Sequence, residues 1–338
     1  MSRKPGKPGK AATANADEQL SVRIGSQERR EQIMVQIAKR YYHLEHTQAD
    51  IADEMGLTRW QVGRLLREAR ESGIVRVDII PRSTRRVELE SALQQRYGLR
   101  EALVLPDTGA DEVTLNSVAQ EAGRYLASLQ PRPQLVGVSW GRTMSAMARW
   151  LPVGWNEGVH VVLLNGAANL RDNDGPSHNV AERFAQAAKG TATLLPVPAI
   201  VGSSKTRQVL EEDPVIGAVM RLGRETTVAC VGIGSLSERS VLVQSGYMDA
   251  DSLQALLKAG AVGDILGRFI DEEGHIVSPD FDARAIGLSP ALLRDKAHAI
   301  GVSAGKAKHR AVKACLLARY INVLVTDEAT ANYLLERP

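Results

Sequence analysis

Hydrophobic residues follow a helical period in the N-terminal part of the chain. Ile33, Ile37 and Tyr41 recur every four residues and mark a first helix that begins near residue 27. Thr47 opens a second, short helix, and Thr58 opens a third that runs to about residue 72. The pattern therefore predicts three consecutive helices before residue 73.

A different pattern begins near Leu103, where short apolar runs alternate with amphipathic segments. Runs of this length separated by helices are typical of β–α–β units and of a largely parallel sheet. We therefore expect an α/β fold, Rossmann-like and mostly parallel, behind the N-terminal helices. The strands are expected at 102–105, 134–138, 159–164, 194–198, 228–233, 299–302 and 322–326.

The second and third helices have the spacing of a helix-turn-helix. Ala52 is small enough for two helices to cross closely, and Gly56 follows where the turn needs a positive φ. Val62 comes six residues later as an apolar anchor, and Thr47 and Thr58 stand where N-cap hydroxyls belong. This spacing favours a DNA-binding motif over an ordinary αα-hairpin, and the β-branched run 74–80 behind it resembles a minimal wing.

If Thr58 starts the recognition helix, the exposed face of that helix is basic and polar. Arginine can contact guanine, and glutamine adenine, in the major groove. Gln48, at the start of the preceding helix, is expected to contact phosphate, and Trp60 to contact DNA or to fasten its helix to a neighbour. The residues expected to contact DNA are Thr47, Gln48, Thr58, Arg59, Trp60, Gln61, Arg64 and Arg67.

Charge is distributed unevenly along the chain. Residues 1–86 hold 17 Lys and Arg against 11 Asp and Glu, a net charge of +6, whereas the whole chain has a net charge of +3. A basic segment on a mildly acidic body indicates that only the N-terminal region meets a polyanion such as double-stranded operator DNA. Four of the basic residues precede residue 11, so charge alone does not establish DNA binding.

The turn Ser139-Trp140-Gly141 joins the expected strand at 134–138 to a helix over 142–150. Backbone N–H groups at the N-terminus of a helix form a ready anion site. Arg142 and Thr143 add a charge and a hydroxyl group there. A tight turn that needs Gly141 for its geometry alone is the alternative.

Polar and small residues also follow other expected strands. The carboxyl ends of parallel strands meet at one edge of a sheet, where open α/β folds bind ligands. Lys306, at a helix start, is interpreted as a phosphate partner rather than a solvated lysine. The Asp264 carboxylate can accept hydrogen bonds from sugar hydroxyls, and a surface turn residue is the alternative. The expected effector-binding residues are Ser139, Trp140, Gly141, Arg142, Thr143, Asn165, Gly166, Ala167, Gly234, Ser235, Asp264 and Lys306.

From residue 29 to residue 335 the chain resembles the SorC-type (sugar-binding) bacterial transcriptional regulators. The resemblance rests on several motifs in order, chiefly Gly137–Thr143, Val231–Gly234, Gly260–Gly267, Gly301–Lys306 and Tyr320–Asp327. It implies an effector domain similar to sugar-phosphate isomerases and deaminases, and a homo-oligomer, a dimer or a tetramer. It also implies regulation of a carbohydrate-related operon by a small effector, and it favours a ligand role for Asp264 over a place in a surface turn. Arg142 and Lys306 favour a phosphorylated sugar or polyol as that effector, with a neutral sugar or polyol as the alternative.

The domain organisation follows from these features. The chain of 338 residues exceeds the usual size of a single domain. Residues 1–26, rich in Lys, Gly, Pro, Ala and Ser, are expected to form a disordered tail. We expect a helix-turn-helix DNA-binding domain over 27–82, a helical linker over 83–98 and an effector-binding domain over 99–338.

Two other functions remain alternatives. A sugar-phosphate isomerase or deaminase with a DNA-binding appendage would need a general base. Asp264 is a candidate, but no second acid–base partner has a persuasive spacing, and His178 and His275 are isolated. A scaffold whose α/β domain only oligomerises is the third possibility. With no metal-ligand cluster and no phosphate-binding loop motif, we expect neither catalysis nor a metal or cofactor.

Composition places the chain in a reducing compartment. Cys230 and Cys315 both lie among apolar residues, so we expect buried free thiols rather than a disulfide. No run of about 18 apolar residues and no signal-peptide pattern occurs, so a cytoplasmic protein that does not enter a membrane is expected.

Overall fold

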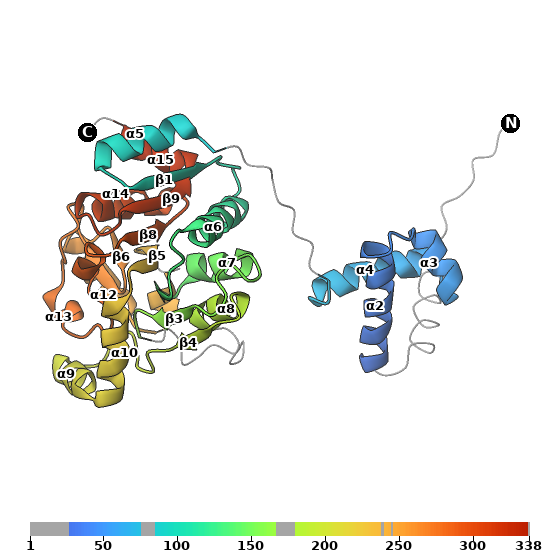
Figure 1. The fold of residues 1–338 in the computed structure, drawn as a ribbon, viewed down its shortest axis with the longest axis horizontal. Helices are drawn as coiled ribbons and strands as arrows, with labels where there is room; N and C mark the ends of the chain where they lie inside the picture. The colour runs from blue at the N-terminus through green and yellow to red at the C-terminus, as the bar shows by residue number, and fades with distance from the viewer. Residues whose placement is uncertain (1–26, 76–84, 167–179, 238–239, 245, 337–338) are drawn as a thin grey trace. The chain divides into compact units, whose positions relative to one another are not determined.

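The computed structural model describes residues 27–75, 85–166, 180–237, 240–244 and 246–336. The chain forms two compact units that divide after Ile80. Figure 1 shows the helices and strands of each unit.

The N-terminal unit contains the three expected helices, α2 (Gln27–Tyr42), α3 (Gln48–Met55) and α4 (Arg59–Glu71). Thr47 and Thr58 each cap the helix that follows by accepting a hydrogen bond from the backbone N–H three residues on. Gly56 ends α3 with a φ of 63°, as the turn requires. The helices enclose a small aliphatic core in which Ile37, Ile51, Val62 and Leu65 are fully buried.

The expected wing strand at 74–80 lies almost wholly outside the described residues. Ile74 and Val75, the two that are described, pack against the three-helix core without forming a strand. The Val75 N–H donates to the Ala69 carbonyl at 2.8 Å, which continues the end of α4.

The C-terminal unit is built on one sheet whose strand order is β1-β9-β8-β5-β2-β3-β4. These seven strands run parallel, and a hairpin of β6 and β7 adds antiparallel pairs at the end of β5. The bounds are β1 (Glu101–Leu105), β2 (Leu135–Val138), β3 (His160–Leu163), β4 (Thr191–Thr193), β5 (Val228–Ser235), β6 (Gly263–Ile265), β7 (Arg268–Ile270), β8 (His298–Val302) and β9 (Val323–Asp327).

Six of the seven expected strands are present, and the one at 194–198 is wrong. The fourth strand is β4, which ends at Thr193. Pro196 and Pro198 have no N–H to donate, so this segment cannot continue the ladder. Its apolar residues Leu195 and Val197 are instead buried in a separate cluster with Ile216 of α10 (Pro214–Glu225).

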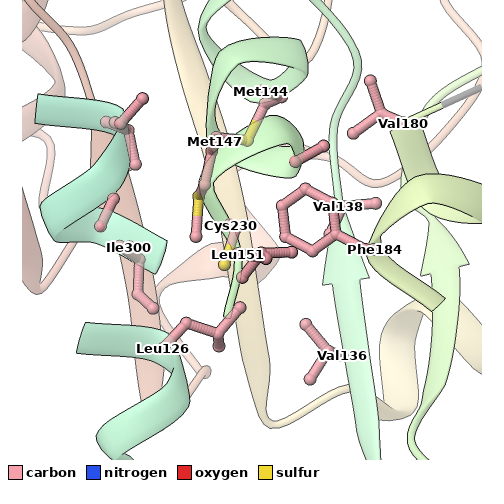
Figure 2. Packing of buried hydrophobic residues seen from close by; sticks show 14 of the residues in the cluster. Leu126, Val136, Val138, Met144, Met147, Leu151, Val180, Phe184, Cys230 and Ile300 are labelled. Atoms are coloured by element: carbon pink, nitrogen blue, oxygen red, sulfur yellow. The ribbon is translucent and has the colours of Figure 1, made fainter. Parts of the chain in front are cut away.

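Helices cover both faces of the sheet because successive strand residues point to opposite faces. Val136, Val138, Cys230 and Ile300 face the helices α6 to α8, as Figure 2 shows. The neighbouring strand residues face α5, α10, α14 and α15. The bounds are α5 (Val87–Tyr97), α6 (Asp111–Ser128), α7 (Arg142–Trp150), α8 (Val180–Ala187), α9 (Ser204–Glu212), α10 (Pro214–Glu225), α11 (Val241–Gln244), α12 (Ala250–Lys258), α13 (Pro279–Asp282), α14 (His309–Leu317) and α15 (Glu328–Leu335), with 3₁₀ turns at Pro290–Leu293 and Lys306–Lys308.

The helix expected as a linker over 83–98 is part of the α/β unit. Leu93 of α5 is fully buried, and the helix packs against β1 and α15. Glu90, also buried, accepts the Val104 N–H of β1 and a two-pronged contact of 2.7 and 2.8 Å from Arg85. The apolar side of α5 is therefore buried within this unit, and the helix is part of the α/β domain and not a separate linker.

Candidate functional site

The order of the strands creates a crevice between β2 and β5. From β2 the chain continues to β3 on one side, whereas from β5 it continues to β8 on the other. Ligands of open α/β sheets bind outside the carboxyl ends of the strands at such a switch point. A cavity of about 80 Å³ lies there, lined by Ser139, Trp140, Gly141, Arg142, Thr143, Met144, Asn165, Gly232, Ile233, Gly234, Ser235, Ser240, Leu242, Asp264, Leu266, Gly267 and Lys308.

The segment that follows β2 is fixed to both neighbouring strands. The buried Ser139 donates its N–H to the Cys230 carbonyl at 3.0 Å and accepts the Gly232 N–H on Oγ at 3.1 Å. The Trp140 indole donates to the Gly166 carbonyl at 2.6 Å. These contacts fix the direction in which α7 leaves the sheet.

The N-terminus of α7 opens onto the cavity. Gly141 precedes the helix with a φ of 127°, and no side chain caps it. The first backbone N–H groups of a helix have no partner within the helix. Since Gly141, Arg142 and Thr143 all line the cavity, this helix end offers N–H donors and a positive dipole end to an anion.

Two cationic side chains stand at this helix end. Lys308 donates from Nζ to Thr143 Oγ1 at 3.1 Å, and Arg142 lies at the rim. Burial, and after it the nearby Arg142, lower the pKa of Lys308 to about 8, although Asp264 and Asp327 act in the opposite direction. The lysine is thus poorly compensated, and an anion beside it would favour its charged form.

Asp264 of β6 also lines the cavity. It stands across from Gly234 in the antiparallel register of β5 and β6, and its Oδ2 accepts the Gly267 N–H at 3.3 Å. Burial raises the pKa of Asp264 to about 6, although the Gly267 N–H and Lys308 both act to lower it. A carboxylate in this position can accept hydrogen bonds from ligand hydroxyls.

The structure brings most of the expected effector residues together. Residues 139–143, Asn165, Gly234, Ser235 and Asp264 line one cavity. Gly166 contributes its carbonyl to Trp140 without lining the cavity, and Ala167 lies outside the described residues. Asn165 is almost fully buried, and its Oδ1 has no hydrogen-bond partner in the described part of the chain.

Lys306 is the residue that the sequence placed wrongly. Its side chain is exposed and does not line the cavity, whereas Lys308 does. Residues 306–308 form a 3₁₀ turn before α14. Because such a turn advances about 120° per residue, the two lysines point in different directions. The sequence showed a cluster of basic residues here but gave no sign of this turn.

The exposed surface of α4 carries the side chains expected to read DNA. Arg59, Trp60 and Arg67 are exposed, and the Arg64 guanidinium lies 5.7 Å from the centre of the Trp60 ring. Gln61 is already engaged, because its Oε1 accepts the Thr58 N–H at 2.8 Å in a capping box. The buried residues of α4 lie on the other side of the helix and hold it against α2 and α3.

The cysteines and the length of the helices bear on the disulfide and membrane expectations. Both cysteines are buried free thiols, and burial raises the pKa of Cys230 to about 12. Among the helices that the structure describes, none is long and apolar enough to cross a bilayer.

Comparison with known proteins agrees with this architecture. Residues 82–336 match the family model described as "Putative sugar-binding domain". The chain is 30% identical over 307 residues to the deoxyribonucleoside regulator of Bacillus subtilis, covering 90% of this chain and 98% of that one. It is 32% identical over 309 residues to the transcriptional regulator LsrR of Klebsiella pneumoniae, covering 90% and 93%. The structure of the full-length sorbitol operon regulator SorC from Klebsiella pneumoniae matches with a TM-score of 0.68 at 29% identity, covering 90% and 98%.

A helical N-terminal unit followed by a sugar-binding α/β unit defines a transcriptional regulator. The chain belongs to the SorC-type family of sugar-binding transcriptional regulators. The relatives are named as regulators, and the chain is accordingly a regulator and not an enzyme.

Proposed function

We propose that this regulator binds operator DNA through α3 and α4, and that a phosphorylated sugar or polyol in the α/β cavity sets its affinity for that DNA. The observation that carries the effector class is the contact of Lys308 with Thr143 at the open N-terminus of α7. The protein acts in the cytoplasm, where the operator is.

The cationic end of the cavity suits a phosphate group. A phosphate dianion accepts hydrogen bonds from the N–H groups at a helix N-terminus and pairs with nearby cations. Arg142, Thr143 and Lys308 provide two positive charges and a hydroxyl group at that end. A neutral sugar would provide no negative charge to pair with these cations.

Two other side chains that line the cavity suit hydroxyl groups. Asp264 offers a carboxylate, and Asn165 offers a buried amide whose oxygen has no hydrogen-bond partner among the described residues. A buried polar group without a partner carries a free-energy cost. A polyhydroxylated ligand would supply donors to both side chains and remove that cost.

The N-terminal unit suits the major groove. Its recognition helix α4 presents Arg59, Trp60, Arg64 and Arg67 on the side away from its core. Operators for such motifs are commonly two-fold symmetric, so we propose a homodimer or a tetramer. The names of relatives, a deoxyribonucleoside regulator and a sorbitol operon regulator, support a carbohydrate-related operon as the target.

A thermal-shift screen of the full chain tests the effector class. Sugars and polyols are compared with their phosphate esters at equal concentration. A ligand that binds only the folded state raises the melting temperature by mass action. Phosphate esters should raise it more than the parent compounds do. A panel in which parent compounds and esters behave alike would contradict a phosphorylated effector.

A further inference from the structure

We propose that Gln48, seated against Gly63, reads a base edge as part of the recognition surface. The inference rests on the proposed function, because it takes α4 to enter the major groove. It assigns to a residue of α3 a role in sequence specificity, in place of the phosphate contact that its position at a helix start suggests.

Gly63 lies in the interior of α4, and its φ is not positive. Glycine is a poor residue for a helix interior, so its presence calls for a packing reason. A Cβ at this position would stand 3.2 Å from Gln48 Oε1, closer than side chains normally allow. The absent side chain therefore lets the Gln48 amide lie directly on the backbone of α4.

The Gln48 amide lies beside Gly63, which stands between two arginines of α4. Arg59, Gly63 and Arg67 follow one another at intervals of four residues and so share one side of the helix. Arg59 and Arg67 are exposed, and Gly63 between them is half-buried beside the start of α3. The Gln48 amide thus occupies the middle of this row, where a residue of α4 would otherwise stand.

The amide that α4 itself carries is not available for the same task. Recognition of adenine by glutamine uses both the oxygen and the nitrogen of the amide. Gln61 is the one glutamine of α4, and its Oε1 is held by the Thr58 N–H. The Gln48 side chain forms no hydrogen bond within the described part of the N-terminal unit.

Base contacts and phosphate contacts have different signatures. Loss of a base contact lowers the preference at particular base pairs and leaves the salt dependence unchanged. Loss of a phosphate contact weakens binding to every sequence and lowers the logarithmic salt slope by about one. The two roles of Gln48 can therefore be separated by experiment.

The test is selection of randomised DNA duplexes with the full-length protein, followed by salt titration on the best site. Gln48→Ala should reduce the base preference roughly tenfold at one or two base pairs per half-site, with the salt slope unchanged. Gly63→Ala should reduce the preference at the same base pairs by a smaller factor. Its melting temperature should be equal to or above that of wild type, because only the flexible end of Gln48 has to move. Gln36→Ala, an exposed glutamine of α2, is the matched control and should leave the profile unchanged.

Each other outcome overturns the inference. Uniform weakening by Gln48→Ala with a lower salt slope would make Gln48 a phosphate contact. An unchanged profile for both variants would remove the pair from the reading surface. A wild-type selection that enriches no sequence would overturn the proposed function, and this inference with it.

Discussion

Gly234 and Asp264 face each other across two antiparallel strands at a distance that only glycine permits. A Cβ on Gly234 would stand 1.9 Å from Asp264 Oδ1. The bare backbone of β5 is therefore what allows this carboxylate to lie along the cavity wall. The glycine at the end of β5 therefore shapes the cavity through its neighbour Asp264.

Gly234→Ala should displace the Asp264 carboxylate and weaken effector binding at least tenfold, since hydrogen bonds to a charged group contribute about 1.5–3 kcal/mol. Calorimetry with the phosphate ester selected by thermal shift measures the change. Gly202→Ala is the matched control, because a Cβ there meets no atom within 4 Å. Equal affinities for the two variants would show that the position of Asp264 does not matter for binding.

Asp264 should also make stability depend on pH. Its pKa of about 6 in the fold lies above the usual 3.8 for aspartate, so the folded protein holds a proton that the unfolded chain releases between about pH 4 and pH 6. Stability attributable to this group is therefore present at low pH and falls as the pH rises through that range.

Asp264→Asn removes the ionisation. Its melting temperature should exceed that of wild type by a few °C at pH 7.5, and the difference should vanish near pH 4. Scanning calorimetry of the free protein at both pH values measures it. Asp295→Asn, at an exposed aspartate, provides the comparison. A difference that grows as the pH falls would have the wrong sign for a raised pKa.

The features that the sequence predicted well are governed by local chemistry. The caps Thr47 and Thr58 and the positive φ of Gly56 depend on a few neighbouring residues, and the three helices follow from them. The turn after β2 and Asn165 were placed together by reasoning about a shared sheet edge, which needs only the order of strands and helices. Asp264 lies in the same cavity, but its role was expected from the family resemblance and not from the sheet edge.

The features that the sequence missed depend on tertiary structure. An apolar run such as 194–198 can be buried in a hydrophobic cluster beside the sheet as well as in a strand, and the sequence does not distinguish the two. The β6–β7 hairpin pairs with the end of β5, and no local sequence pattern predicts this pairing. A single 3₁₀ turn decides that Lys308 and not Lys306 lines the cavity. The position of α5 is decided by its packing against β1 and α15.

Replacement of Arg64 tests the recognition helix. Arg64→Ala removes the guanidinium beside the Trp60 ring. Affinity for the specific operator should fall by roughly 1–3 kcal/mol if the side chain contacts a base, and binding to unrelated DNA should change less. Fluorescence anisotropy at fixed salt measures both. An unchanged specific affinity would remove Arg64 from the reading surface.

The boundary between the units can be tested by truncation. A fragment of residues 81–338 should fold and bind the effector without binding DNA. A fragment that begins at Val87 should melt at a lower temperature, because the buried Glu90 loses its partner Arg85. Arg85 is 37% exposed, so solvent screens the pair, and the cost should stay below the roughly 3–5 kcal/mol that follows loss of one partner of a fully buried pair. Equal melting temperatures would show that this pair does not stabilise the unit.

The most direct measurement of the central claim is operator affinity with and without the selected phosphate ester, in wild type, Lys308→Ala and Lys306→Ala. Saturating ester should change the operator affinity of wild type and of Lys306→Ala by about fivefold or more, in the same direction. Lys308→Ala should bind the operator normally without ester and should need at least tenfold more ester for the same response. If Lys308→Ala responds at the wild-type concentration, or if Lys306→Ala is the variant that fails, the cavity at the N-terminus of α7 is not the site through which the effector acts.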